Sequence, residues 1–126
     1  MSRFDHERLD VYHLALEFVA DSLHLAQGLP RGRSILGDQL RRAAISICLN
    51  IAEGSGEFTA NEKSRFYRIA KRSAVECAAI LDLVVLWMLG HEEEALFRER
   101  AQQGKEKLDR VVAMLVRMIH RMESEN

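Results

Sequence analysis

The sequence predicts an all-α protein that folds as an antiparallel, up-down-up-down four-helix bundle. Apolar residues recur every three or four positions along four segments, whereas no segment alternates in the manner of a strand. The chain contains a single proline, Pro30, so long helices can run without interruption. Short links between the segments make consecutive helices antiparallel. The chain is predicted to form one domain, residues 1–126, with helices at about 7–27, 34–53, 60–89 and 92–122.

The first helix, predicted over residues 7–27, has one apolar face and a second apolar edge beside it. Its main face comprises Tyr12, Ala15, Leu16, Val19, Leu23 and Ala26. The helix is predicted to end at Gly28-Leu29-Pro30, because glycine favours the position after a helix C-terminus and proline cannot continue a helix.

The second helix, predicted over residues 34–53, has the most regular apolar stripe of the four. The stripe comprises Leu36, Leu40, Ala43, Ala44, Ile47 and Ile51. Several of its members are small, which indicates a helix that packs closely against its neighbours. The glycine-rich turn Gly54-Ser55-Gly56 is predicted to terminate it.

The third helix, predicted over residues 60–89, begins at a capping box formed by Thr59 and Glu62. In this motif each side chain is expected to bond a free backbone amide of the other residue. The apolar line of the helix comprises Phe66, Ile69, Ala70, Ser73, Cys77, Leu81, Val84 and Met88, and Gly90 closes it.

The fourth helix, predicted over residues 92–122, starts with three glutamates that suit the positive end of a helix dipole. Its apolar line comprises Leu108, Val111, Val112, Leu115, Met118, Ile119 and Met122. Gly104 is a poor helix former, and we expect it either to weaken this helix or to divide it in two.

The predicted helices carry more apolar surface than one bundle can bury. Residues 78–89 of the third helix contain a single charged side chain, Asp82. A helix that is apolar nearly all round must be buried nearly all round, yet one side of each helix in a monomeric bundle faces water. The sequence therefore predicts a homo-oligomer, in which a second copy covers the excess. Coverage by loops or frayed ends is the alternative.

Positive charge is concentrated in the middle third of the chain, although the whole chain has a net charge of −1. The arginines predicted to bind nucleic acid or a partner protein are Arg41, Arg42, Arg65, Arg68 and Arg72. A ridge of arginines can neutralise phosphates and gives salt-dependent binding. The same side chains can instead pair with nearby glutamates on the helix surface. Both interpretations stay open from the sequence.

Polar residues interrupt the second and third helices at positions that share a face. They are Gln39, Ser46, Asn50, Glu53, Ser73 and Glu76. We expect them to form a hydrogen-bonded layer between the helices or between subunits, which would fix register and oligomeric state. Exposure to solvent near the helix ends is the alternative.

The sequence predicts neither an enzyme nor a metal or cofactor site. A di-iron bundle needs Glu-x-x-His on two helices, and the nearest match, Asp21 with His24, lies on a polar face. No nucleophile elbow is present, and the glycine-rich turn lacks the lysine of a phosphate-binding loop. Cys48 and Cys77 are isolated within apolar patterns and are expected to be plain buried thiols.

The composition, 48% hydrophobic and 29% charged, is that of an ordinary globular protein. The first ten residues contain no apolar run of the kind found in a secretory signal. No uncharged stretch is long enough to cross a bilayer. A cytoplasmic protein without membrane association is the expectation.

One set of motifs in the second and third helices is distinctive. It begins with the run Gln39-Leu40-Arg41-Arg42-Ala43-Ala44, continues with Ser46-Ile47 and Asn50-Ile51-Ala52-Glu53-Gly54, and ends with Phe66, Ile69-Ala70, Ser73 and Glu76. With the opening Leu9-Asp10-Val11-Tyr12, it closely resembles the "four helix bundle protein" family over almost the whole chain. These proteins are encoded in intervening sequences of bacterial 23S ribosomal RNA. The family includes the accessory variability determinants of diversity-generating retroelements.

The resemblance implies an antiparallel four-helix bundle that assembles into a barrel-like homopentamer. For the retroelement members it also implies binding to a reverse transcriptase and to nucleic acid through a basic exterior. The net charge of −1 departs from a strongly basic barrel. Fold and assembly are therefore the properties that we most expect this chain to share with the family.

The function predicted from the sequence is that of a non-catalytic oligomeric scaffold or adaptor. It would dock nucleic acid or a reverse transcriptase through the basic surface of the second and third helices. One alternative is a self-assembling bundle that binds no nucleic acid. The other is a small-molecule binder with a polar pocket around Asn50, Glu53 and Glu76.

Overall fold

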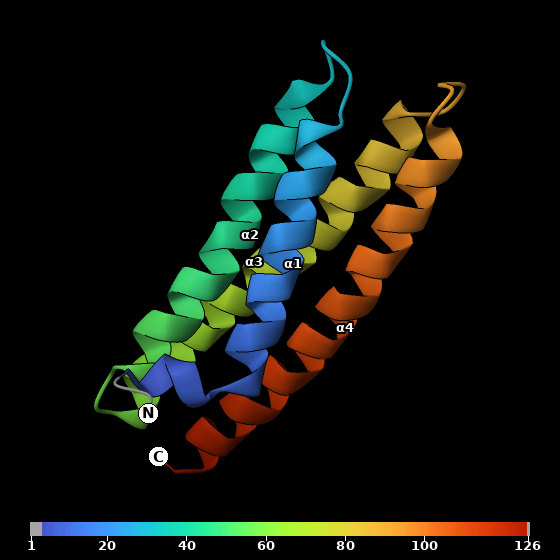
Figure 1. Ribbon diagram of the computed structural model, residues 1–126. Helices are drawn as coiled ribbons and strands as arrows, with labels where there is room; N and C mark the ends of the chain where they lie inside the picture. The colour runs from blue at the N-terminus through green and yellow to red at the C-terminus, as the bar shows by residue number, and fades with distance from the viewer. Residues whose placement is uncertain (1–3, 126) are drawn as a thin grey trace.

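The computed structural model describes residues 4–125, and all of its regular elements are helical. A short 3-10 helix precedes four α-helices (Figure 1). The elements are η1 (Asp5–Arg8), α1 (Asp10–Gln27), α2 (Ser34–Ser55), α3 (Ala60–Trp87) and α4 (Glu94–Ser124). The predicted all-helical, four-helix fold is confirmed over these residues.

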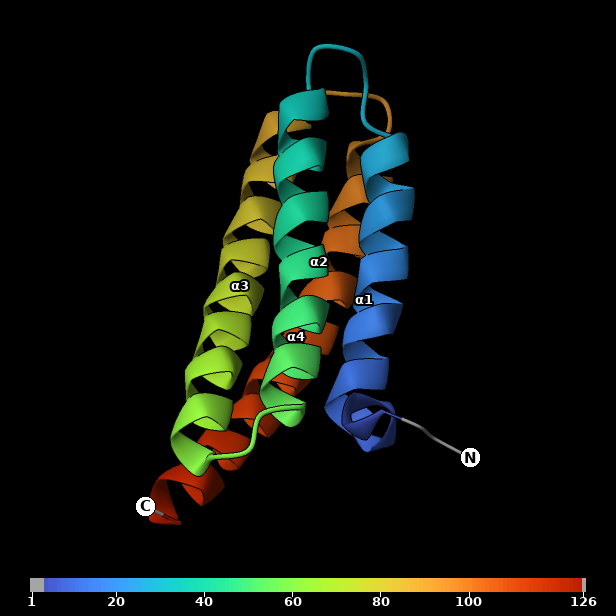
Figure 2. The same ribbon diagram turned by 90° about the vertical axis from the view of Figure 1, so that its left-hand side faces the viewer.

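The four α-helices run antiparallel and stand at the corners of a square. Each of α1 and α3 packs against both α2 and α4, so α1 and α3 lie diagonally opposite each other. Figures 1 and 2 show the α1–α2 and α3–α4 loops at one end, called here the upper end. The lower end holds η1, the α2–α3 turn and the end of α4. This order is the predicted up-down-up-down topology.

Five of the eight ends of the α-helices differ from the predicted ones by two or three residues, and the other three coincide. The first α-helix begins at Asp10 because Leu9 is extended, with ψ 122°, and separates it from η1. The fourth begins at Glu94 rather than at position 92. The Glu94 carboxylate accepts a hydrogen bond from the Gly90 amide at 2.7 Å, and His91 Nδ1 accepts one from the Glu93 amide at 3.1 Å. These hydrogen bonds hold residues 90–93 in a turn, so the helix starts two residues later than predicted.

The predicted capping box at the start of α3 forms in one direction. Thr59 Oγ1 accepts a hydrogen bond from the Glu62 amide at 3.1 Å, as an N-cap side chain should. The Glu62 carboxylate turns outward and accepts a bond from Arg65 Nε at 3.4 Å. The helix start was therefore predicted correctly, whereas the reciprocal bond was not.

The core is formed largely by the predicted apolar stripes of α2, α3 and α4, whereas the predicted main face of α1 was wrong. Leu16 and Leu23 of that face are exposed. The second apolar edge of α1 faces the core instead, with Val11, Leu14, Phe18 and Leu25 buried.

In α2, the side chains of Leu40, Ala44, Ile47 and Ile51 are wholly buried. They pack with buried residues of the other three helices in one continuous cluster. The regular spacing of the α2 stripe is therefore what places this helix against the core.

Gly104 does not divide α4, which runs without a break from Glu94 to Ser124. The expectation of a broken helix was wrong because Gly104 is buried at a close contact. A Cβ atom at this position would lie 3.0 Å from Leu81 Cδ1 and 3.3 Å from the Phe18 ring. Tertiary packing makes glycine useful here, despite its poor intrinsic helix propensity.

Within the described residues, no helix is both long enough and apolar enough to cross a membrane.

Gly54 lets the end of α2 approach the start of α3. A Cβ atom at position 54 would lie 2.7 Å from Cε1 of Tyr67 and 3.1 Å from Cβ of Phe66. Real Cβ atoms do not approach carbon this closely, so a larger residue would force the two helices apart. Tyr67 is buried, so its ring has little freedom to move away.

We predict that Gly54→Ala lowers the free energy of unfolding by about 2 kcal/mol, because overpacking at this contact outweighs the gain in helix propensity. Urea denaturation followed by circular dichroism measures the change. Gly56→Ala is the matched control, since a Cβ there meets nothing closer than the Ala52 carbonyl oxygen at 3.7 Å. Equal stability of the two variants would contradict the packing role.

Candidate functional site

Three of the predicted polar-layer residues meet where α2 contacts α3. The Ser46 and Ser73 hydroxyl oxygens lie 2.9 Å apart. Asn50 donates from Nδ2 to the Ser46 carbonyl at 2.9 Å and to Ser46 Oγ at 3.1 Å. Ser73 is buried, and the other two side chains are half-buried. The bonds link one turn of α2 to the facing turn of α3.

The structure does not bring the other three members of that set into the layer. The side chains of Gln39, Glu53 and Glu76 are exposed. None of them forms a hydrogen bond or an ion pair with another described residue. Spacing along a helix identified a shared face but not the depth at which each side chain lies.

We predict that Ser73→Ala destabilises the fold by about 1 kcal/mol, the usual contribution of a partly buried neutral hydrogen bond. The double variant Ser46→Ala, Ser73→Ala should cost less than the sum of its parts, because both changes remove the same bond. Ser124→Ala serves as a control, since its hydroxyl bonds only the Arg121 carbonyl at the exposed end of α4. Additive effects in urea denaturation would contradict the coupling.

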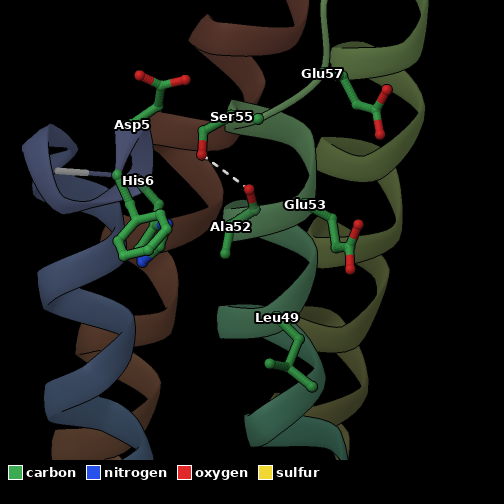
Figure 3. Close-up of a pocket in the computed structure, with 9 residues that line it drawn as sticks. Asp5, His6, Leu49, Ala52, Glu53, Ser55 and Glu57 are labelled. Atoms are coloured by element: carbon green, nitrogen blue, oxygen red, sulfur yellow. Dashed lines mark hydrogen bonds between the residues drawn. The ribbon is translucent and has the colours of Figure 1, made fainter.

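A shallow groove at the lower end involves Glu53, but it is not the pocket proposed around Asn50, Glu53 and Glu76. Its lining comprises Phe4, Asp5, His6, Leu49, Ala52, Glu53, Ser55, Gly56 and Glu57. Figure 3 shows Asp5 and His6 on one side of Ser55, and Glu53 and Glu57 on the other. The carboxylates do not converge on one point, and Asn50 and Glu76 do not line the groove.

Three of the five arginines proposed as partner contacts are engaged with carboxylates of the same chain. Arg41 pairs with Asp38, Arg65 with Glu62, and Arg68 with Glu123. The Arg68 pair, at 2.6 Å, ties α3 to the end of α4, and Arg65 also lies 4.8 Å from the centre of the Phe66 ring. Arg42 and Arg72 form no ion pair with a described residue. The internal-pairing interpretation therefore applies to three of the five arginines, and contact of the others with a partner stays a prediction.

The sequence interpretation missed a second group of arginines. Arg8, Arg117 and Arg121 line one groove between the start of α1 and the end of α4. Charges summed over thirds of the chain hid this group, because residues 73–126 are acidic overall. The i, i+4 spacing of Arg117 and Arg121 could have indicated a basic edge on α4. Only the fold could bring Arg8 beside them.

The two cysteines are buried free thiols, as predicted. Burial raises the pKa of the Cys48 thiol to about 11. Burial, with a smaller contribution from the Glu76 carboxylate, raises the pKa of the Cys77 thiol to about 12. The folded state therefore keeps both thiols protonated and unreactive at neutral pH. No group of three potential His, Cys, Asp or Glu metal ligands occurs among the described residues.

We predict that neither thiol reacts with Ellman's reagent at pH 8 until urea unfolds the chain. The free energy of unfolding should fall as the pH rises above about 9, because unfolded thiols lose their protons near pH 8.5 while the folded ones retain theirs. The fall should continue to about pH 11–12, where the folded thiols ionise. A variant with alanine at positions 48 and 77 should show a smaller fall. Rapid labelling of the folded protein would contradict the burial argument.

The described residues form a polar layer between α2 and α3, and no catalytic groups converge among them. A protein-family model described as "23S rRNA-intervening sequence protein" matches residues 7–117. The chain belongs to this family. The match confirms the resemblance noted in the α2 and α3 motifs, and it spans all of α1, α2 and α3 and most of α4. No curated protein sequence matches the chain. The family description states no reaction or ligand.

Proposed function

We propose that this chain is a non-catalytic, cytoplasmic scaffold that assembles with copies of itself and docks nucleic acid. The observation that carries the proposal is the amount of apolar surface the isolated bundle leaves uncovered. Exposed large apolar side chains occur on every α-helix, and they are most numerous on the upper half of α3. Scattered apolar residues are ordinary on a protein surface, but a contiguous apolar patch marks an interface.

The strongest candidate for the contact between copies is a groove at the upper end, between α2 and α3. It is lined by Leu36, Leu83, Leu86 and Trp87. The nearby Asp82 pairs with Lys105 of α4 at 2.7 Å, so no charged side chain lines the groove. Arg33 lies beside the groove, where its Nε donates to the Trp87 carbonyl oxygen at 3.0 Å. The lining residues themselves are apolar and suit another apolar helix face. The family resemblance supports five copies arranged as a barrel.

The docking of a nucleic acid is supported by positive charge that the chain does not neutralise internally. Arg42 and Arg72 have no ion-pair partner in the described part of the chain. Free guanidinium groups bind phosphates and release counterions. A reverse transcriptase is the alternative partner suggested by the resemblance. The small-molecule alternative has little support, since Asn50, Glu53 and Glu76 share no pocket.

Assembly is tested by placing a charge in the apolar groove. We predict that the wild-type chain sediments as an oligomer and that Leu83→Glu shifts it toward the monomer, because burying an unpaired carboxylate at an interface is costly. Sedimentation equilibrium measures the mass. Fluorescence of Trp87, the single tryptophan, should shift to longer wavelength as the oligomer dissociates.

Gln102→Glu is the matched control, because it adds the same charge at an exposed polar position of α4. A monomeric wild-type chain would contradict the scaffold proposal. An oligomer that Leu83→Glu leaves intact would instead place the contact on another face.

A further inference from the structure

The groove between the start of α1 and the last turns of α4 is lined by three arginines. Its lining comprises Arg8, Leu9, Asp10, Val11, Met114, Arg117, Met118 and Arg121, and it encloses about 290 Å³. Three arginines thus line the groove together with apolar residues, while Asp10 is the acidic lining residue. The groove lies at the lower end, away from the apolar groove between α2 and α3.

The three arginines of this groove lack the internal partners that other arginines have. Neither Arg8, Arg117 nor Arg121 forms an ion pair with a described residue. By contrast, Arg98, on the same helix as two of them, pairs with Glu94 at 2.9 Å. Like charges gathered in one groove repel each other, and a bound anion would relieve this repulsion. Guanidinium groups suit phosphate because their donors form a planar fork.

The basic surface continues along α4 beyond the groove. Arg110 is exposed, has no ion-pair partner in the described chain, and lies seven residues before Arg117 on the same side of the helix. At 1.5 Å per residue, Arg110 and Arg121 are separated by roughly 16 Å along the helix axis. A single phosphate would engage one end of such a line. An extended chain of phosphates could engage all of it.

We propose that this groove, and not the α2–α3 surface, is the principal contact for the phosphate backbone of a nucleic acid. The inference rests on the proposed nucleic-acid docking and names its site. Of the five arginines first assigned to that role, Arg41, Arg65 and Arg68 pair with carboxylates, so binding a phosphate to them would require breaking an internal ion pair. Among the described residues, the α2–α3 surface thus offers two unpaired arginines, Arg42 and Arg72, whereas the groove gathers three. Binding a phosphate at the groove requires no internal ion pair to be broken. The contact is to the backbone, so recognition is largely independent of sequence.

The test measures binding of a short fluorescent single-stranded RNA of mixed sequence by anisotropy, over a series of salt concentrations. In the double variant Arg117→Gln, Arg121→Gln, we expect binding at low salt to weaken roughly tenfold and the slope of log K against log salt to fall by about 1.4, two phosphate contacts at 0.7 each. Glutamine keeps the helix propensity of arginine, so the fold should persist. Circular dichroism and sedimentation check this for each variant.

Two further variants make the result specific. Arg98→Gln removes an internally paired arginine from the other end of α4 and should leave binding and slope unchanged. The ridge variant, Arg42→Gln, Arg72→Gln, removes the two arginines of the α2–α3 surface that have no ion-pair partner among the described residues, and should weaken binding less than the groove variant. Binding lost in the ridge variant but retained in the groove variant would overturn the inference while leaving nucleic-acid docking intact.

Two other outcomes would also overturn it. A wild-type chain that binds no RNA at low salt would refute both this inference and the docking part of the proposed function, while its oligomeric mass would still test assembly separately. In a parallel arm, the chain is sedimented with vesicles of phosphatidylserine and phosphatidylcholine. Groove-dependent binding to these vesicles without binding to RNA would assign the groove to a membrane surface instead.

Discussion

The close approach of α2 and α3 is the constraint on which the rest of the structure depends. Small residues make it possible: Ala44, Ala70 and Ala74 are wholly buried, and Gly54 leaves room for the ring of Tyr67. The Ser46–Ser73 contact fixes the register of the two helices at this point. Close backbones leave no space between the helices for additional large side chains. Apolar residues at the edge of the contact, such as Leu83 and Trp87, therefore stay on the surface.

The proposed activities follow from this geometry at opposite ends of the bundle. At the upper end, Asp82 is held by Lys105, and the α2–α3 groove is left wholly apolar. At the lower end, the 3-10 helix brings Arg8 to the last turns of α4. An apolar contact between copies and an electrostatic contact with phosphates would therefore not compete for the same surface. A long, narrow bundle separates them without needing a second domain.

The assignment of arginines shows where sequence reasoning stops. A count of charges identified the middle third of the chain as basic, and this count is correct. It could not tell which guanidinium groups are neutralised, because the partner of Arg68 is Glu123, fifty-five residues away. The basic groove on α4 went unnoticed for the same reason, since Arg8 comes from the opposite end of the chain. Ion pairing depends on distances of a few ångströms, which a linear pattern does not contain.

The sequence by itself determined the number of helices, their order and most of the core residues of α2, α3 and α4, because apolar spacing acts locally along each helix. Which of the two apolar edges of α1 is buried was decided only by its packing against α2 and α4. It also determined the start of α3, since Thr59 caps the backbone within its own turn. Only the tertiary structure decided that Gly104 is a packing site and not a break, and that Ser46, Asn50 and Ser73 meet while Glu53 and Glu76 do not. These outcomes depend on close packing between residues of two different helices. The sequence pattern of one helix does not show which residues of its neighbour it contacts.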